Sequence, residues 1–162
     1  MKRMKVIIGI LMALILVFTS GLTSVKADVK EEIGKSVDGS LLTNQSESED
    51  ISFSLAKGTD LYQGRAKISA LSSNKINAFG MTAAYHDCDD IDLYLFIEQY
   101  KNGSWSTYDI YQYTGHNISV LSKSVNLQVE SGYYYRLRGY HRTYNDGRQE
   151  STSTTTDGIY IG

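Results

Sequence analysis

The densest cluster of side chains that could do chemistry runs from His86 to Asp92, with the sequence HDCDDID. Carboxylate oxygens are the ligands that Ca²⁺ prefers, and the calcium candidates are Asp87, Asp89, Asp90 and Asp92. The cluster lacks the glycine and the closing glutamate of a helix-loop-helix calcium loop. We therefore predict no metal site, and we interpret the cluster as a solvated turn whose acids also discourage edge-to-edge aggregation.

Signatures of catalysis are sparse. No Ser or Cys nucleophile motif accompanies His86, His116 or His141, although nucleophilic catalysis needs such a pair. Glu98 and Asp109 could serve as the two carboxylates of a glycoside hydrolase, but we expect them crowded on one strand face. We predict a non-catalytic protein without a cofactor, with an uncharacterised extracellular hydrolase as the alternative.

Aromatic and arginine side chains form the most specific functional pattern. The candidate ligand-binding residues are Tyr94, Tyr100, Trp105, Tyr111, Arg136 and Arg138. Aromatic rings can stack on the C–H faces of sugars, and guanidinium groups suit carboxylates and phosphates. The same residue types are enriched at protein interfaces, and tyrosine also occupies solvent-facing strand positions through β propensity alone.

These residues are placed by a hairpin at Asn102-Gly103, a dipeptide typical of a two-residue turn. The register that this turn predicts pairs Tyr100 with Trp105, Ile97 with Tyr108, Leu95 with Ile110, and Tyr94 with Tyr111. One face is then the core face, with Leu93, Leu95, Ile97, Tyr108 and Ile110. The other face is aromatic and polar, with Tyr94, Phe96, Tyr100, Trp105, Tyr111, Tyr113, Asp92, Glu98 and Asp109.

The remaining pattern is that of an all-β protein. Extended segments are expected at 61–70, 75–85, 91–100, 105–114, 117–129, 133–143 and 152–161, and no window has a helical period. Arg136, Arg138 and Arg142 share one face of the sixth segment, and His141 lies on its inner face. We predict an antiparallel β-sandwich, for which an immunoglobulin- or fibronectin-like topology is an option. Tyr134 or Tyr135 would then be its tyrosine corner.

Residues 1–27 are typical of a secretory signal peptide. Lys2, Arg3 and Lys5 precede an apolar run of 13 residues, which is too short to span a bilayer. A stretch of small and polar residues follows, and we place the cleavage site after Ala27. Residues 28–58 are interpreted as a flexible polar segment, in which Leu41 and Leu42 could dock on the domain. A short strand at residues 51–55 is an option, because these residues alternate with period two. Residues 59–162 form the predicted β-sandwich domain.

Charge and cysteine content narrow the function classes. Cleavage would remove four of the 16 basic residues and no acid, leaving 12 against 18 and a formal charge of −6. This charge argues against nucleic acid and gives no reason for membrane docking after cleavage. Cys88 is the only cysteine, so no intramolecular disulfide is available, and we expect a buried thiol.

Several segments together resemble a known family. They are Ser40-Leu41-Leu42-Thr43, Gly80-Met81-Thr82-Ala83, Asp90-Ile91-Asp92-Leu93, Gly103-Ser104-Trp105, Tyr135-Arg136-Leu137 with His141, and Thr156-Asp157-Gly158-Ile159. The set is similar to a family of small secreted proteins of Gram-positive bacteria known only as a domain of unknown function. The resemblance implies a secreted Gram-positive protein and assigns no catalytic residue or ligand.

The sequence therefore predicts a secreted binding or interaction protein. Its partner is unknown, and an extracellular glycan or protein bound through the aromatic strand face fits the pattern. A protein-interaction or bacteriocin-like protein is a further alternative.

Overall fold

The computed structural model describes Gly39, residues 41–54 and residues 58–162. The predicted signal peptide and the first part of the predicted polar segment lie outside the described residues. The described part is all-β, as predicted, and contains no helix. Its strands are β1 (Leu42–Thr43), β2 (Glu47–Phe53), β3 (Leu61–Ser72), β4 (Lys75–Lys101), β5 (Ser104–Gln128), β6 (Tyr133–Asn145), β7 (Arg148–Thr155) and β8 (Gly158–Ile161).

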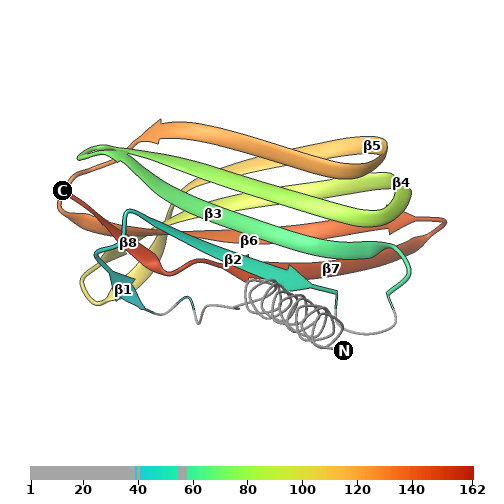
Figure 1. Cartoon of the computed structure of the whole chain (residues 1–162), viewed down its shortest axis with the longest axis horizontal. Coiled ribbons are helices and arrows are strands. Elements are labelled where there is room, and N and C mark those ends of the chain that lie inside the picture. The colour runs from blue at the N-terminus through green and yellow to red at the C-terminus, as the bar shows by residue number, and fades with distance from the viewer. Residues whose placement is uncertain (1–38, 40, 55–57) are drawn as a thin grey trace, which may run out of the picture. The chain divides into compact units, whose positions relative to one another are not determined.

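All eight strands belong to one hydrogen-bonded sheet (Figure 1). The strand order is β1-β8-β6-β4-β3-β2, with β5 beside β4 and β7 beside β6. The sheet is mixed, because β1 pairs parallel with β8 while the other pairs are antiparallel. The sequence predicted two sheets packed face to face, whereas the chain forms one continuous sheet that curls on itself like half of a barrel.

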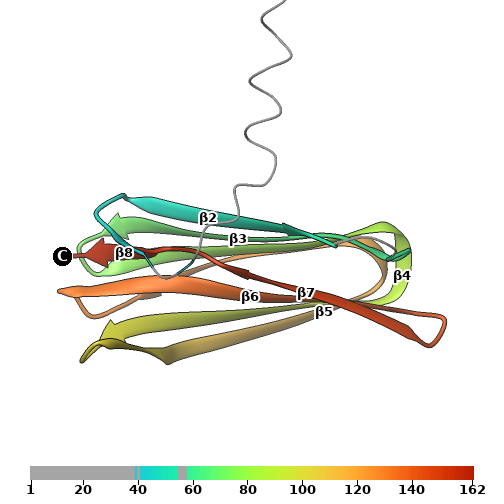
Figure 2. The same ribbon diagram turned by 90° about the horizontal axis from the view of Figure 1, so that it is seen from below.

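The curl comes from a bend in the β4–β5 hairpin. Before the bend β4 pairs with β3, and after it β4 pairs with β6. The pairing of β4 with β5 shifts register between Ala83 and Cys88, where the strands turn over. Figure 2 shows both strands passing from one half of the sheet to the other. The predicted segments 75–85 and 91–100 are therefore the two parts of one bent strand, β4. The predicted segments 105–114 and 117–129 are likewise the two parts of β5.

Glycines bring the two halves of the curled sheet into contact. A Cβ added at Gly64 of β3 would lie 2.3 Å from Cδ2 of His141 in β6. One added at Gly80, before the bend, would lie 2.5 Å from Cδ2 of Leu95, after it. Aliphatic side chains fill the space between the halves, and those with no exposed surface include Ile68, Ile76, Ile91, Leu93, Leu95, Ile97, Leu137 and Ile159.

β2 shows that the sheet extends into the segment that the sequence assigned to a polar tail. Its inward positions are polar, and they bind the backbone of the last part of the chain. The N–H of Thr155 donates to Asp50 Oδ2 (2.7 Å), and the N–H of Asp157 donates to Ser48 Oγ (2.9 Å). β2 is therefore held by its antiparallel ladder with β3 and by these side chain to backbone hydrogen bonds. The alternation of apolar residues indicates only its end, at residues 51–53.

The predicted turn at Asn102-Gly103 is confirmed, a second turn of the same kind joins β6 to β7, and Tyr135 makes the hydrogen bond expected of the corner tyrosine. Asn102 and Gly103 have φ of 54° and 79°, and Asp146 and Gly147 have φ of 49° and 76°, the positive values that two-residue hairpins need. Tyr135, one of the two predicted corner residues, donates its hydroxyl to the carbonyl of Glu130 (2.8 Å). Burial raises the pKa of Tyr135 to about 12.

Candidate functional site: an outer face of arginine and aromatic side chains

A β-bulge decides which aromatic residues of the first hairpin share a face. Tyr100 pairs with Trp105, as predicted, but the register then shifts at Ile97, which pairs with Asp109. Tyr108 is the extra residue, and a bulge leaves such a residue outside the ladder. Leu95 consequently lies opposite Tyr111. The predicted pairs beyond Tyr100 and Trp105 are therefore wrong by one residue.

The shift changes the face of every later residue in the first half of β5. Tyr111 and Tyr113 pack against the core instead of lying on the outer face. Ile110, predicted in the core, is 53% exposed, and Tyr108 is 38% exposed with its ring edge-on to Tyr135. Asp109 moves to the inner side with its partner Ile97. Tyr111 is thus separated from the other candidate ligand-binding residues.

The other five candidates do share a face. Antiparallel partners point to the same side of a sheet, and β4 and β6 pair Tyr100 with Tyr134, Glu98 with Arg136, and Phe96 with Arg138. The same ladder pairs Tyr94 with Tyr140 and Asp92 with Arg142. We call this surface the outer arginine–aromatic face, and it comprises Tyr94, Phe96, Tyr100, Trp105, Tyr134, Arg136, Arg138, Tyr140, Arg142 and Tyr160.

Two buried carboxylates hold the arginines of this face in place. Glu98 is 7% exposed and accepts from Arg136 Nε at 2.7 Å and from Arg138 Nε at 3.1 Å. Asp92 is 3% exposed and accepts from Arg142 Nε at 2.7 Å. Hydrogen bonding to Asp92 raises the pKa of the Arg142 guanidinium. Such charge-assisted bonds fix the planes of the guanidinium groups.

The arginines stack on the aromatic rings beside them. The guanidinium carbon of Arg136 lies 4.3 Å from the ring centroid of Trp105, and that of Arg138 lies 4.2 Å from the centroid of Phe96. The Phe96 ring is in turn stacked with Tyr94, at a centroid distance of 6.5 Å and an interplanar angle of 11°. The face is therefore a fixed arrangement of rings and cations, because each group is held by its neighbours.

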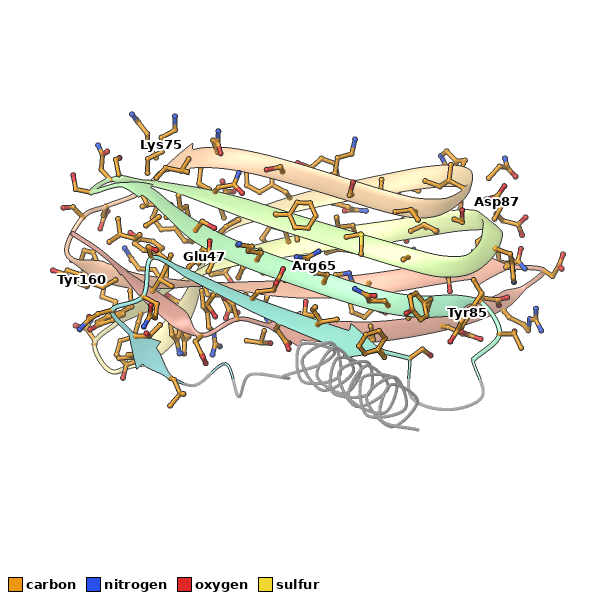
Figure 3. The ribbon with its side chains drawn as sticks, in the orientation of Figure 1. Glu47, Arg65, Lys75, Tyr85, Asp87 and Tyr160 are labelled. Carbon is orange, nitrogen blue, oxygen red and sulfur yellow. The ribbon has the colours of Figure 1, made fainter. Side chains whose placement is uncertain are left out.

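Tyr160 extends the face beyond the sequence prediction. Its ring centroid lies 5.2 Å from that of Tyr134, and the Tyr100 and Trp105 rings are equally close to each other. Tyr160 lies at the end of the sheet that also carries Lys75, opposite the bend with Tyr85 and Asp87 (Figure 3). The shared face of Arg136, Arg138 and Arg142 in β6 was predicted from the sequence, but the pairing of Tyr134 with Tyr160 of β8 was not.

The acidic cluster His86–Asp92 lies at and after the bend of β4, and its carboxylates have separate partners. Asp92 binds Arg142, Asp90 contacts Nδ1 of His116 at 2.5 Å, and Asp89 accepts from the N–H of Asp146 at 3.0 Å. Asp87 is exposed at the bend. Within the part of the chain that the structure describes, no three acidic, histidine or cysteine side chains are grouped to hold a metal ion.

The groups that a hydrolase would need lie apart. His141 is fully buried on the inner face, where Nδ1 lies 3.0 Å from Thr82 Oγ1 and Nε2 lies 2.9 Å from Thr154 Oγ1. Burial lowers the pKa of His141 to about 4. Glu98 is held under the outer arginines, and Asp109 is on the inner side. Glu98 therefore lies on the opposite side of the sheet from His141 and Asp109.

Cys88 is a buried thiol, as predicted, with 1% of its surface exposed. Burial raises the pKa of its thiol. A nucleophilic cysteine needs a lowered pKa, so the environment of Cys88 is that of a packing residue.

The described residues form an all-β fold whose outer face gathers arginine and aromatic side chains. Residues 24–159 match the sequence model of the Family of unknown function (DUF6147), and the chain belongs to this family. Comparisons with curated proteins and with solved structures find no match. Among the described residues, no helix has the length and apolar character needed to cross a bilayer.

Proposed function

We propose that this protein is an exported, non-catalytic binding protein that recognises a carbohydrate polymer through its outer arginine–aromatic face. The observation that carries the proposal is the alternation of rings and guanidinium groups across β5, β4, β6 and β8. Glu98, Asp92 and the mutual stacking of these groups keep them in place before any ligand arrives. Preorganised binding groups lose little entropy when a ligand binds.

The charge of the face suits a neutral or weakly acidic polymer. Arg136, Arg138 and Arg142 stand against Glu98 and Asp92, which leaves one positive charge on the face of an acidic protein. The negative π-faces of the rings attract the weakly positive C–H groups on a sugar ring. Guanidinium edges can donate to hydroxyl or carboxylate oxygens beside them.

The cellular setting is also part of the proposal. The basic start, the apolar run of 13 residues and the cleavage site at Ala27 support export. The family resemblance supports a Gram-positive origin. Together they favour the glycan polymers of the cell wall over a soluble sugar.

The test is a sedimentation assay of purified protein with insoluble peptidoglycan, chitin and cellulose. Tyr94→Ala and Arg138→Gln each remove one group from the middle of the face. We expect either change to weaken retention about tenfold, which corresponds to about 1.4 kcal/mol. Tyr85→Ala is the matched control, because Tyr85 is 60% exposed at the bend and contacts Tyr62 instead of the face.

If Tyr94→Ala and Arg138→Gln are retained as strongly as the wild type and the Tyr85→Ala control, recognition through this face is refuted. Absence of binding to every polymer, combined with capture of one defined extracellular protein that Tyr94→Ala abolishes, would assign the same face to a protein partner. Tyrosine and arginine are also enriched in protein interfaces, which is why the second outcome is the main competitor.

A further inference from the structure

One long border of the curled sheet is uncovered. β5 pairs with β4 and with no other described strand. The opposite borders, β2 and β7, form no ladder with each other, but side-chain hydrogen bonds link them. The hydroxyls of Ser52 and Thr152 lie 2.6 Å apart, and the N–H of Thr155 donates to Asp50 Oδ2. Figure 1 shows β5 along the free side of the sheet. An edge strand presents unpaired N–H and C=O groups that can pair with another chain.

The β5 edge carries a bulge at Tyr108 and a bend near His116, but few other features that block such pairing. Native edges are protected by prolines and by several charged side chains. The chain contains no proline, and residues 109–123 read DIYQYTGHNISVLSK. The titratable groups of β5, tyrosines aside, are Asp109, His116 and Lys123, which follow one another at intervals of seven residues. This spacing is symmetric about His116.

We propose that the β5 edge pairs with β5 of a second copy of this chain, antiparallel and centred on His116. A two-fold axis at His116 places Asp109 of each copy opposite Lys123 of the other copy. The dimer then contains two equivalent ion pairs. A slip of the register by two residues in either direction separates both pairs, so charge complementarity selects this register over its neighbours.

The same register joins like faces of the two sheets. Asp109 lies opposite Ile97, and Lys123 opposite Gly80, both on the inner side of the sheet. Nζ of Lys123 lies 5.5 Å from the ring centroid of Tyr113, across the open side of the curl. Tyr111 of one copy would face Leu121 of the other, so apolar side chains already packed at the rim of the core would extend it between copies.

The bend in β5 limits this assembly to two copies. Asn117 has a positive φ of 51°, and β5 turns over close to His116. The two-fold axis passes through the bend and runs along the strand direction. It places the part of β5 before the bend in one copy beside the part of β5 after the bend in the other copy. These two parts run antiparallel. A two-fold contact of this kind uses the same surface on both copies and therefore ends at a dimer.

Charge reversal tests the register directly. In a dimer of the Asp109→Lys variant, both contacts between positions 109 and 123 bring two lysines together. In a dimer of the Lys123→Asp variant, both contacts bring two aspartates together. We expect either variant to raise the dimer dissociation constant about tenfold or more, because two attractive pairs become repulsive. Mixing the two single variants restores opposite charges at both contacts, and so does the double variant Asp109→Lys/Lys123→Asp.

The measurement is analytical ultracentrifugation of the full chain, with thermal unfolding as the check that each variant is folded. Glu47→Lys, on the β2 border, is the matched control and should dimerise like the wild type. A wild type that stays monomeric at tens of micromolar overturns self-pairing. Single variants that dimerise as well as the wild type, or fail to associate when mixed, overturn the register.

Discussion

His141 should make the stability of this protein depend on pH in the mildly acidic range. It is a fully buried histidine between Thr82 and Thr154. Thr82 Oγ1 also donates to the carbonyl of Asp92 at 3.0 Å, so it accepts from Nδ1–H of His141. Nε2 is then free to accept from the Thr154 hydroxyl. Both nitrogens of the neutral ring are satisfied, and protonation would place a charge in the core without a carboxylate partner.

The size of the effect follows from the lowered pKa. An unfolded histidine titrates near pH 6.5, whereas His141 in the folded chain titrates near pH 4. Between these two pH values the imidazole of residue 141 is protonated in the unfolded chain and neutral in the folded chain. The free energy of unfolding therefore falls as the pH decreases through this window. The full difference corresponds to about 3 kcal/mol, and the loss from pH 7.5 to pH 5 is about 2 kcal/mol.

The assay is urea unfolding of the wild type and of His141→Gln, followed by Trp105 fluorescence at several pH values. The variant should be less stable near pH 7.5, since its amide fills the site less well, and the gap should shrink by about 2 kcal/mol at pH 5. Comparing the two proteins cancels the shared titration of carboxylates and of His86, whose pKa is raised by a hydrogen bond to the carbonyl of Asp87. Parallel stability curves would refute the reasoning.

Three other predictions concern the interior. Gly64→Ala should destabilise the fold by about 1–3 kcal/mol in urea titration, because the added Cβ meets the ring of His141 at 2.3 Å; an unchanged midpoint would contradict the close contact of the two halves. Tyr135→Phe should cost about 1–3 kcal/mol through loss of its hydroxyl bonds, whereas Tyr134→Phe on the outer face should change stability little. The Cys88 thiol should react with a thiol reagent only as fast as the protein opens, and immediate labelling of folded protein would show that it is accessible.

The sequence predicted those parts of the fold that depend on local chemistry. Asn102-Gly103 determined the first turn, because both positions need positive φ. Tyr135 was one of two candidates for the corner because the chain turns at Gly132 just before it. The aliphatic residues of β4 alternate strictly, so Leu93, Leu95 and Ile97 were correctly placed in the core.

The sequence did not predict features that depend on partners distant in the chain. The bulge at Tyr108 has no residue signature, and it moved Tyr111 from the predicted binding face to the core side. Only the end of β2, residues 51–53, was offered as a strand from the sequence, because Ser48 and Asp50 satisfy backbone groups more than 100 residues away. The candidate face was recovered in large part because β4 and β6 alternate without a bulge between them.

The bent hairpin has a mechanical consequence. β4 and β5 contribute to both halves of the curled sheet, so the same backbone ladder runs through each half. Neither half can melt separately without breaking the strand pair that the other half needs. The two halves of the described sheet should therefore lose their structure together, in one step.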